Sequence, residues 1–85
     1  MSKEEKLIQR LLTIPSDFKF GELKTLLGRL GFAVTHRGKT SGSRVAFLHT
    51  ESKVIVRIHK PHPNDELPKA ALKEVVAILE ENKMI

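Results

Sequence analysis

The sequence predicts an α+β domain in which a three-stranded antiparallel sheet has helices packed on one face. Apolar residues recur with helical spacing before Phe32 and after Pro68, and they alternate with other residues in between. The connections inside the alternating region are short, as hairpins require. With 85 residues, of which 40% are apolar, the chain is long enough for one small core. We therefore expect a single domain over residues 1–85.

Two amphipathic helices are expected before the sheet. The first follows a capping-box pattern at Ser2–Glu5 and carries a stripe of leucine and isoleucine up to about Thr13. Pro15 interrupts this pattern, and a second leucine stripe ends at Gly31, a residue typical of the position just after a helix. Gly28 weakens the second helix, and close packing against a neighbour is the expected reason for its presence.

Three strands are expected next, joined by turn-rich segments at 38–42 and 50–53. A sheet of this size buries only one face against helices. The alternation assigns to the buried face Phe32, Val34, Val45, Phe47, Val54, Val56 and Ile58. It assigns to the open face Thr35, Arg37, Arg44, Ala46, Leu48, Ile55, Arg57 and His59. Three arginines and a histidine thus share the face that the helices leave open.

A stiff, extended loop is expected from His59 to Leu67, because its prolines donate no hydrogen bonds to a ladder. Pro68 then suits the first turn of a last helix that runs to about Asn82. The residues of this helix that we expect to pack inward are Leu72, Val75, Val76, Ile78 and Leu79.

The net charge of +5 is concentrated in one segment. Between His36 and Lys60 there are six basic residues and one acid, whereas the segments before and after carry +2 and −2. Clustered cations favour a polyanion as partner, and nucleic acid before a membrane, because binding releases counterions from phosphates. The alternative is a basic surface that contacts only solvent.

The amino-acid composition also excludes several kinds of functional site. The chain has no cysteine, which excludes disulfides, zinc ribbons and thiol nucleophiles. No apolar run is long enough for a signal peptide or a membrane span, so we expect a soluble, cytoplasmic protein. The chain has no Trp or Tyr, and its Phe residues fall mostly at core positions, so base stacking on the sheet is not expected. Any RNA binding is therefore expected to be through phosphate groups, 2′-hydroxyl groups and shape.

Two segments carry candidate functional groups. Segment 38–44 combines glycines, hydroxyl residues and bases, which suits either a phosphate-binding loop or a plain hairpin turn, but its order is not that of a P-loop. His59 and His62 offer imidazoles, which transfer protons near neutral pH. RNA cleavage by 2′-hydroxyl attack needs a base, a proton donor and a cation. Two histidines fall short of a zinc site, so no metal or other cofactor is expected.

Several stretches resemble the HicA toxin family: Leu23–Phe32, Gly42–Phe47, Pro61–Pro63, Glu66–Lys69 and the closing helix. The similarity runs roughly from Leu23 to Leu79 and leaves the first helix as an addition. It implies a fold similar to the double-stranded-RNA-binding domain and metal-independent endoribonuclease activity on mRNA. It also implies neutralisation by a cognate HicB-like antitoxin.

The sequence departs from this family at the catalytic histidine. That histidine follows a Gly-Ser pair by one or two positions, which are Arg44 and Val45 here. Arginine binds phosphate but does not act as a base at neutral pH. We therefore expect His59 and His62 to be the catalytic residues, by our own inference and not by transfer from the family. The residues expected to bind RNA are Arg37, Lys39, Ser43, Arg44, Arg57 and Lys60.

Three functions compete at this point. The first is a toxin that binds and cleaves mRNA and so inhibits translation. The second is a catalytically silent module that acts only by binding RNA or an antitoxin. The third is an adaptor that binds proteins through an apolar patch of Leu48 and Ile55 and has no salt-dependent affinity for RNA.

Overall fold

A computed structural model describes residues 3–35, 44–61 and 65–85. The elements in this part of the chain are α1 (Lys3–Leu12), α2 (Phe20–Arg29), β1 (Phe32–Thr35), β2 (Arg44–His49), β3 (Ile55–His59) and α3 (Lys69–Glu81). The strands pair antiparallel in the order β1-β2-β3. The α+β class and the antiparallel sheet expected from the sequence are confirmed.

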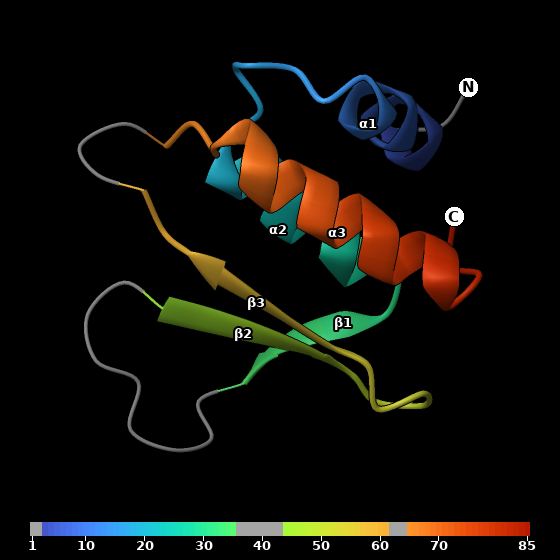
Figure 1. Cartoon of the computed structure of the whole chain (residues 1–85). Helices are drawn as coiled ribbons and strands as arrows, with labels where there is room; N and C mark the ends of the chain where they lie inside the picture. The colour runs from blue at the N-terminus through green and yellow to red at the C-terminus, as the bar shows by residue number, and fades with distance from the viewer. Residues whose placement is uncertain (1–2, 36–43, 62–64) are drawn as a thin grey trace.

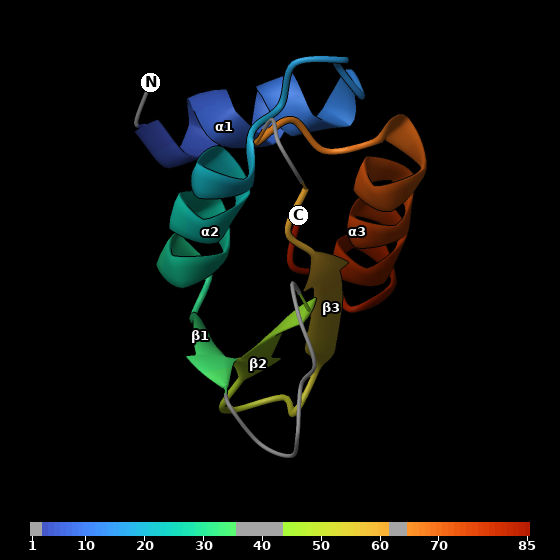
Figure 2. The same ribbon diagram turned by 90° about the vertical axis from the view of Figure 1, so that its left-hand side faces the viewer.

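The elements are stacked in three layers. Figure 1 shows the sheet at one side of the molecule, with α2 and α3 above it and α1 above these helices. The turned view of Figure 2 separates α2, which lies toward β1, from α3, which lies beside β3. No helix within the described ranges covers the other face of the sheet. That open face is therefore available to a partner.

The pairing register confirms the expected division of the sheet into two faces. Phe47 lies opposite Val34 on one side and Val56 on the other, and both Phe47 and Val56 are about 1% exposed. On the opposite face Ala46 lies between Thr35 and Arg57. Because successive side chains alternate, a register shifted by one residue would bring the arginines into the core. Burial of the apolar set thus fixes which side chains the open face presents.

Two extended segments that are distant in sequence pair beside the core. Phe20 donates its N–H to the carbonyl of Asp65 at 2.7 Å, and Leu67 donates to the carbonyl of Phe18 at 2.8 Å. Phe18 and Leu67 are both buried. The sequence pattern did not predict this pairing, which holds the start of α2 against the chain that leads into α3. Pro68 caps α3 and is not part of its first turn.

Gly28 and Gly31 have different roles at the end of α2. The expectation that Gly28 permits close packing is wrong, because a Cβ at this position would meet nothing within 4 Å. Gly31 has a φ of +102°, and a Cβ there would lie 2.9 Å from Nε2 of His49. The His49 ring packs edge-on against Phe32, with the ring centres 5.2 Å apart. Gly31 is therefore needed both for its backbone conformation and for the approach of His49.

Candidate nucleic-acid interface

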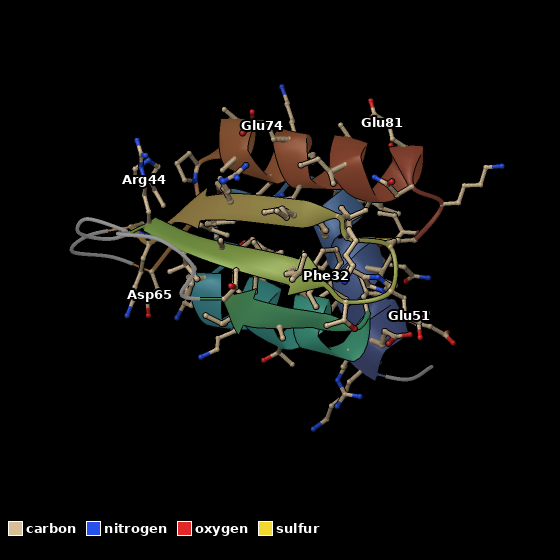
Figure 3. All side chains as sticks on the ribbon, turned by 90° about the horizontal axis from the view of Figure 1, so that it is seen from below. Phe32, Arg44, Glu51, Asp65, Glu74 and Glu81 are labelled. Atoms are coloured by element: carbon tan, nitrogen blue, oxygen red, sulfur yellow. The ribbon has the colours of Figure 1, made fainter. Side chains whose placement is uncertain are left out.

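One end of the open face carries the basic groups. Arg44 begins β2, His59 ends β3, and the two residues are directly opposite each other in the antiparallel pair. Arg57 lies on the same face, opposite Ala46, and all three polar side chains are exposed. Figure 3 looks onto this face and shows Arg44 at one end of the sheet. Cβ atoms of directly opposed residues lie about 5 Å apart, so Arg44 and His59 can contact the same phosphate group.

The two arginines of this face have no acidic partner in the described part of the chain. Ion pairs there are those of Arg10, with Asp17 and Glu22. Arg44 and Arg57 therefore form no ion pair among the described residues, although Glu74 lines the same hollow as Arg57. Adjacent, unneutralised guanidinium groups attract phosphate, which they bind through paired N–H donors.

The other end of the open face is apolar. Leu48 lies between Ala33 and Ile55, and Ile55 is 40% exposed. These side chains are four residues further along the strands than Arg44 and His59, which corresponds to about 13 Å. The open face is thus divided into a basic end and an apolar end. A partner that covers both ends needs acidic and apolar groups, whereas a phosphate backbone needs only the basic end.

The structure brings together three of the residues predicted for the site, namely Arg44, Arg57 and His59. Lys60 is not on the open face. Its ammonium lies 6.0 Å from the ring centre of Phe20, on the side of the sheet that faces the helices. The remaining predicted site residues lie outside the described part of the chain, namely Arg37, Lys39, Ser43 and His62.

The register also separates Arg44 from Val45, the two residues that follow the Gly-Ser pair. Arg44 is exposed on the open face, whereas Val45 is half-buried and lies opposite Ile58 of the core. A side chain at position 45 therefore points toward the helices. Position 44 therefore presents its side chain on the open face.

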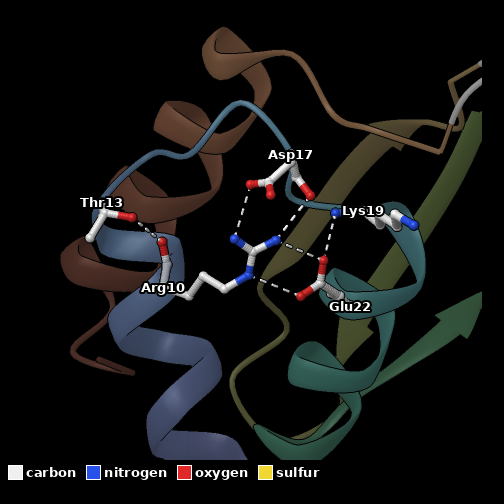
Figure 4. Close-up of polar contacts among 5 residues, drawn as sticks. All are labelled: Arg10, Thr13, Asp17, Lys19 and Glu22. Carbon is white, nitrogen blue, oxygen red and sulfur yellow. Dashed lines mark hydrogen bonds and ion pairs between the residues drawn. The ribbon is translucent and has the colours of Figure 1, made fainter.

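Arg10 forms a polar cluster that the sequence analysis did not find. Its guanidinium donates to both carboxylate oxygens of Glu22, at 3.1 and 3.0 Å, and to Oδ1 and the carbonyl of Asp17, at 3.0 and 2.9 Å (Figure 4). Oε1 of Glu22 also accepts the N–H of Lys19 at 3.0 Å. Hydrogen bonds from Arg10 lower the pKa of Asp17 and, against the opposing effect of burial, that of Glu22. The cluster joins α1 to the start of α2 and has a structural role.

Neither a metal centre nor a membrane span is found within the ranges that the structure describes. No group of three or more His, Asp or Glu side chains there is placed to hold a metal ion. None of the helices there is long and apolar enough to cross a membrane.

A three-stranded sheet with helices on one face and arginines on the other defines a small α+β protein of the type found in the double-stranded-RNA-binding domain. The family model described as "HicA toxin of bacterial toxin-antitoxin" matches residues 20–82. The match covers well over half of the chain, so the chain belongs to the HicA toxin family. No curated protein and no solved structure matches it. The chain is thus a toxin of a toxin–antitoxin system, with an antitoxin as partner, and α1 lies outside the matched region.

Proposed function

We propose that the chain binds mRNA across the open face of its sheet and cleaves it, which inhibits translation in the cytoplasm. The observation that carries this proposal is the Arg44–His59 pair, with Arg57 on the same face and neither arginine ion-paired to an acid in the described ranges. An imidazole beside two guanidinium groups supplies a proton acceptor and cations for a phosphate. Membership of the HicA toxin family supports the same assignment.

In the proposed reaction, His59 accepts the proton of a ribose 2′-hydroxyl. The 2′-oxygen attacks the adjacent phosphorus, and Arg57 stabilises the negative charge that develops on the phosphorane oxygens. The bond from phosphorus to the 5′-oxygen then breaks, which leaves a 2′,3′-cyclic phosphate and a 5′-oxygen that takes up a proton. His62 is the proposed donor of that proton. The reaction consumes no metal, oxidant or second substrate.

A second candidate function follows from Arg44 itself. An arginine stands at the exposed position from which a family histidine would act, and arginine does not accept a proton at neutral pH. If His59 does not replace that base, the chain retains an RNA-binding surface without cleavage. Its action would then be to hold RNA or to occupy the antitoxin.

The antitoxin is proposed to be a HicB-like protein that covers the open face. The basic end of that face attracts an acidic surface, and its apolar end around Ile55 buries apolar side chains of the same partner. One partner then blocks the RNA contacts of the open face by occlusion. This assignment also accounts for the exposure of Ile55 without a separate adaptor function.

Cleavage of a labelled mRNA fragment by the purified protein in excess EDTA tests the proposal. The unmodified protein should cleave, and His59→Gln should cleave roughly 10²- to 10⁴-fold more slowly, the usual contribution of a general base. Lys73→Gln, an exposed change on α3, is the control and should cleave at the unmodified rate. Binding without cleavage by the unmodified protein would establish the silent alternative. Absence of RNA binding would overturn both RNA cleavage and the holding of RNA.

A further inference from the structure

A pocket opens on the helix side of the sheet, at the end where β1 finishes and β2 begins. It encloses about 240 Å³. Its cationic side chains come from three separate parts of the fold, with Lys24 on α2, Arg44 on β2 and Lys60 directly after β3. Its apolar wall is formed by Phe20, Val34 and Val45. None of the described residues that line it is acidic.

The three cations of this pocket are not neutralised by a described neighbour. The ion pairs in the described ranges belong to Arg10, so Lys24, Arg44 and Lys60 form none there. The ammonium of Lys60 is held 6.0 Å from the ring centre of Phe20, within the range of a cation–π contact. Three positive groups that line one apolar hollow repel one another. An anion bound among them removes that repulsion.

We infer that this pocket binds one phosphodiester group of an RNA strand whose neighbouring nucleotides lie on the open face. The inference rests on the proposed function, since it concerns the same RNA. Arg44 connects the pocket to the open face. It is paired with His59 on the open face, and it also lines the pocket. The phosphate lies among the three cations, and the adjoining ribose packs against Val34 and Val45.

Lys24 distinguishes this binding site from the open face. It projects from α2, on the side of the sheet opposite to Arg57, and is exposed. An RNA that contacted only the open face would not reach it. If the strand passes around the end of the sheet at Arg44, Lys24 contributes to affinity although it lies outside the catalytic surface.

The test is the salt dependence of RNA binding, measured by fluorescence anisotropy. The probe is a labelled, fully 2′-O-methylated RNA oligonucleotide, which keeps its phosphates but cannot be cleaved by 2′-hydroxyl attack. Loss of one phosphate contact in Lys24→Gln should flatten the slope of log affinity against log salt by about 0.7, the value per contact for single strands. Lys24→Glu should weaken binding further. Lys73→Gln removes an equal charge from α3, away from the pocket, and should leave the slope unchanged.

Two further measurements, with Arg57→Gln and with a competing mononucleotide, distinguish the possible results. If Arg57→Gln flattens the slope but Lys24→Gln and Lys24→Glu do not, the pocket inference is overturned while the open-face function stands. If the unmodified protein does not bind the oligonucleotide, the proposed function falls and this inference with it. Adenosine 5′-monophosphate is the competitor for a free-nucleotide site. If this mononucleotide displaces the labelled RNA at a lower concentration than the unlabelled oligonucleotide does, the pocket is a site for a small ligand. That result would overturn the inference.

Discussion

Arg44 and His59 face each other across the β2–β3 pair, and both side chains are exposed on the open face. Arg44→His should therefore add a second imidazole to the open face and raise the rate of mRNA cleavage. Because a positioned acid or base contributes roughly 10²- to 10⁴-fold, an increase of at least about tenfold is expected. Single-turnover cleavage in EDTA measures it. A rate that falls instead would show that phosphate binding by Arg44 matters more than a further base.

Arg57 should account for one phosphate contact. Arg57→Gln removes its charge without changing the buried face of β3, so the folded structure should persist. We expect the slope of log RNA affinity against log salt to flatten by about 0.7–0.9. Titrations at several salt concentrations give this slope. An unchanged slope would remove Arg57 from the RNA interface.

Charge reversal at Arg57 should affect both proposed partners at once. Arg57→Glu places an acid in the centre of the basic end, where it repels phosphate and an acidic antitoxin surface alike. RNA affinity and antitoxin affinity should both fall, each measured by calorimetry with the purified partner. Lys73→Gln serves again as the control variant. Loss of only one affinity would show that the two partners use different surfaces.

Stability should decline in acid through the Arg10 cluster. Arg10 holds the pKa values of Asp17 and Glu22 below their ordinary range, so the folded protein binds these protons less readily than the unfolded chain. The stabilisation is complete above about pH 5 and is lost as the pH falls through the two lowered pKa values. Urea unfolding between pH 7 and pH 3 measures the effect. Arg10→Met should be less stable at pH 7 and lose less stability on acidification, and equal losses in both proteins would contradict this account.

Gly28→Ala should stabilise the protein. An added Cβ at this helical position meets nothing within 4 Å, so the substitution gains the better helix propensity of alanine, about 0.5–1 kcal/mol. Gly31→Ala is the matched opposite. There the positive φ and the nearby His49 ring predict a loss of more than about 1 kcal/mol. Thermal unfolding of the two variants measures whether each substitution raises or lowers the stability. A Gly28→Ala variant that is less stable than the unmodified protein would contradict the open surroundings described for Gly28.

The sequence predicted the elements and faces of the sheet because both depend on local periodicity. Phe47 and Val56 alternate with Ala46 and Arg57 in the chain itself, and burial of the apolar set excludes a register shifted by one residue. The presence of Arg44 and His59 on one face followed from the same parity, whereas their direct pairing is given by the structure. Here local pattern and packing agree.

Other features were not accessible to such reasoning because they depend on packing between separate segments. Arg10 finds its partners 7 and 12 residues away, and nothing in their spacing distinguishes them from other surface charges. Lys24 appeared only as a polar residue of an amphipathic helix. Its position beside Lys60 results from the way α2 crosses the sheet. Gly28 was interpreted wrongly for a related reason. We expected close packing against a neighbour to explain a glycine inside α2, but no neighbouring atom lies within 4 Å of the position of its Cβ.

The outer layer formed by α1 has a practical use. It lies on the far side of α2 and α3 from the open face, and the native chain contains no cysteine (Figure 1). A single thiol introduced at the exposed Gln9 of α1 would therefore be the unique attachment point for a dye or a sensor surface. Such a conjugate would present the whole sheet to solution, so that RNA and antitoxin could compete for it in one recording without interference from the label.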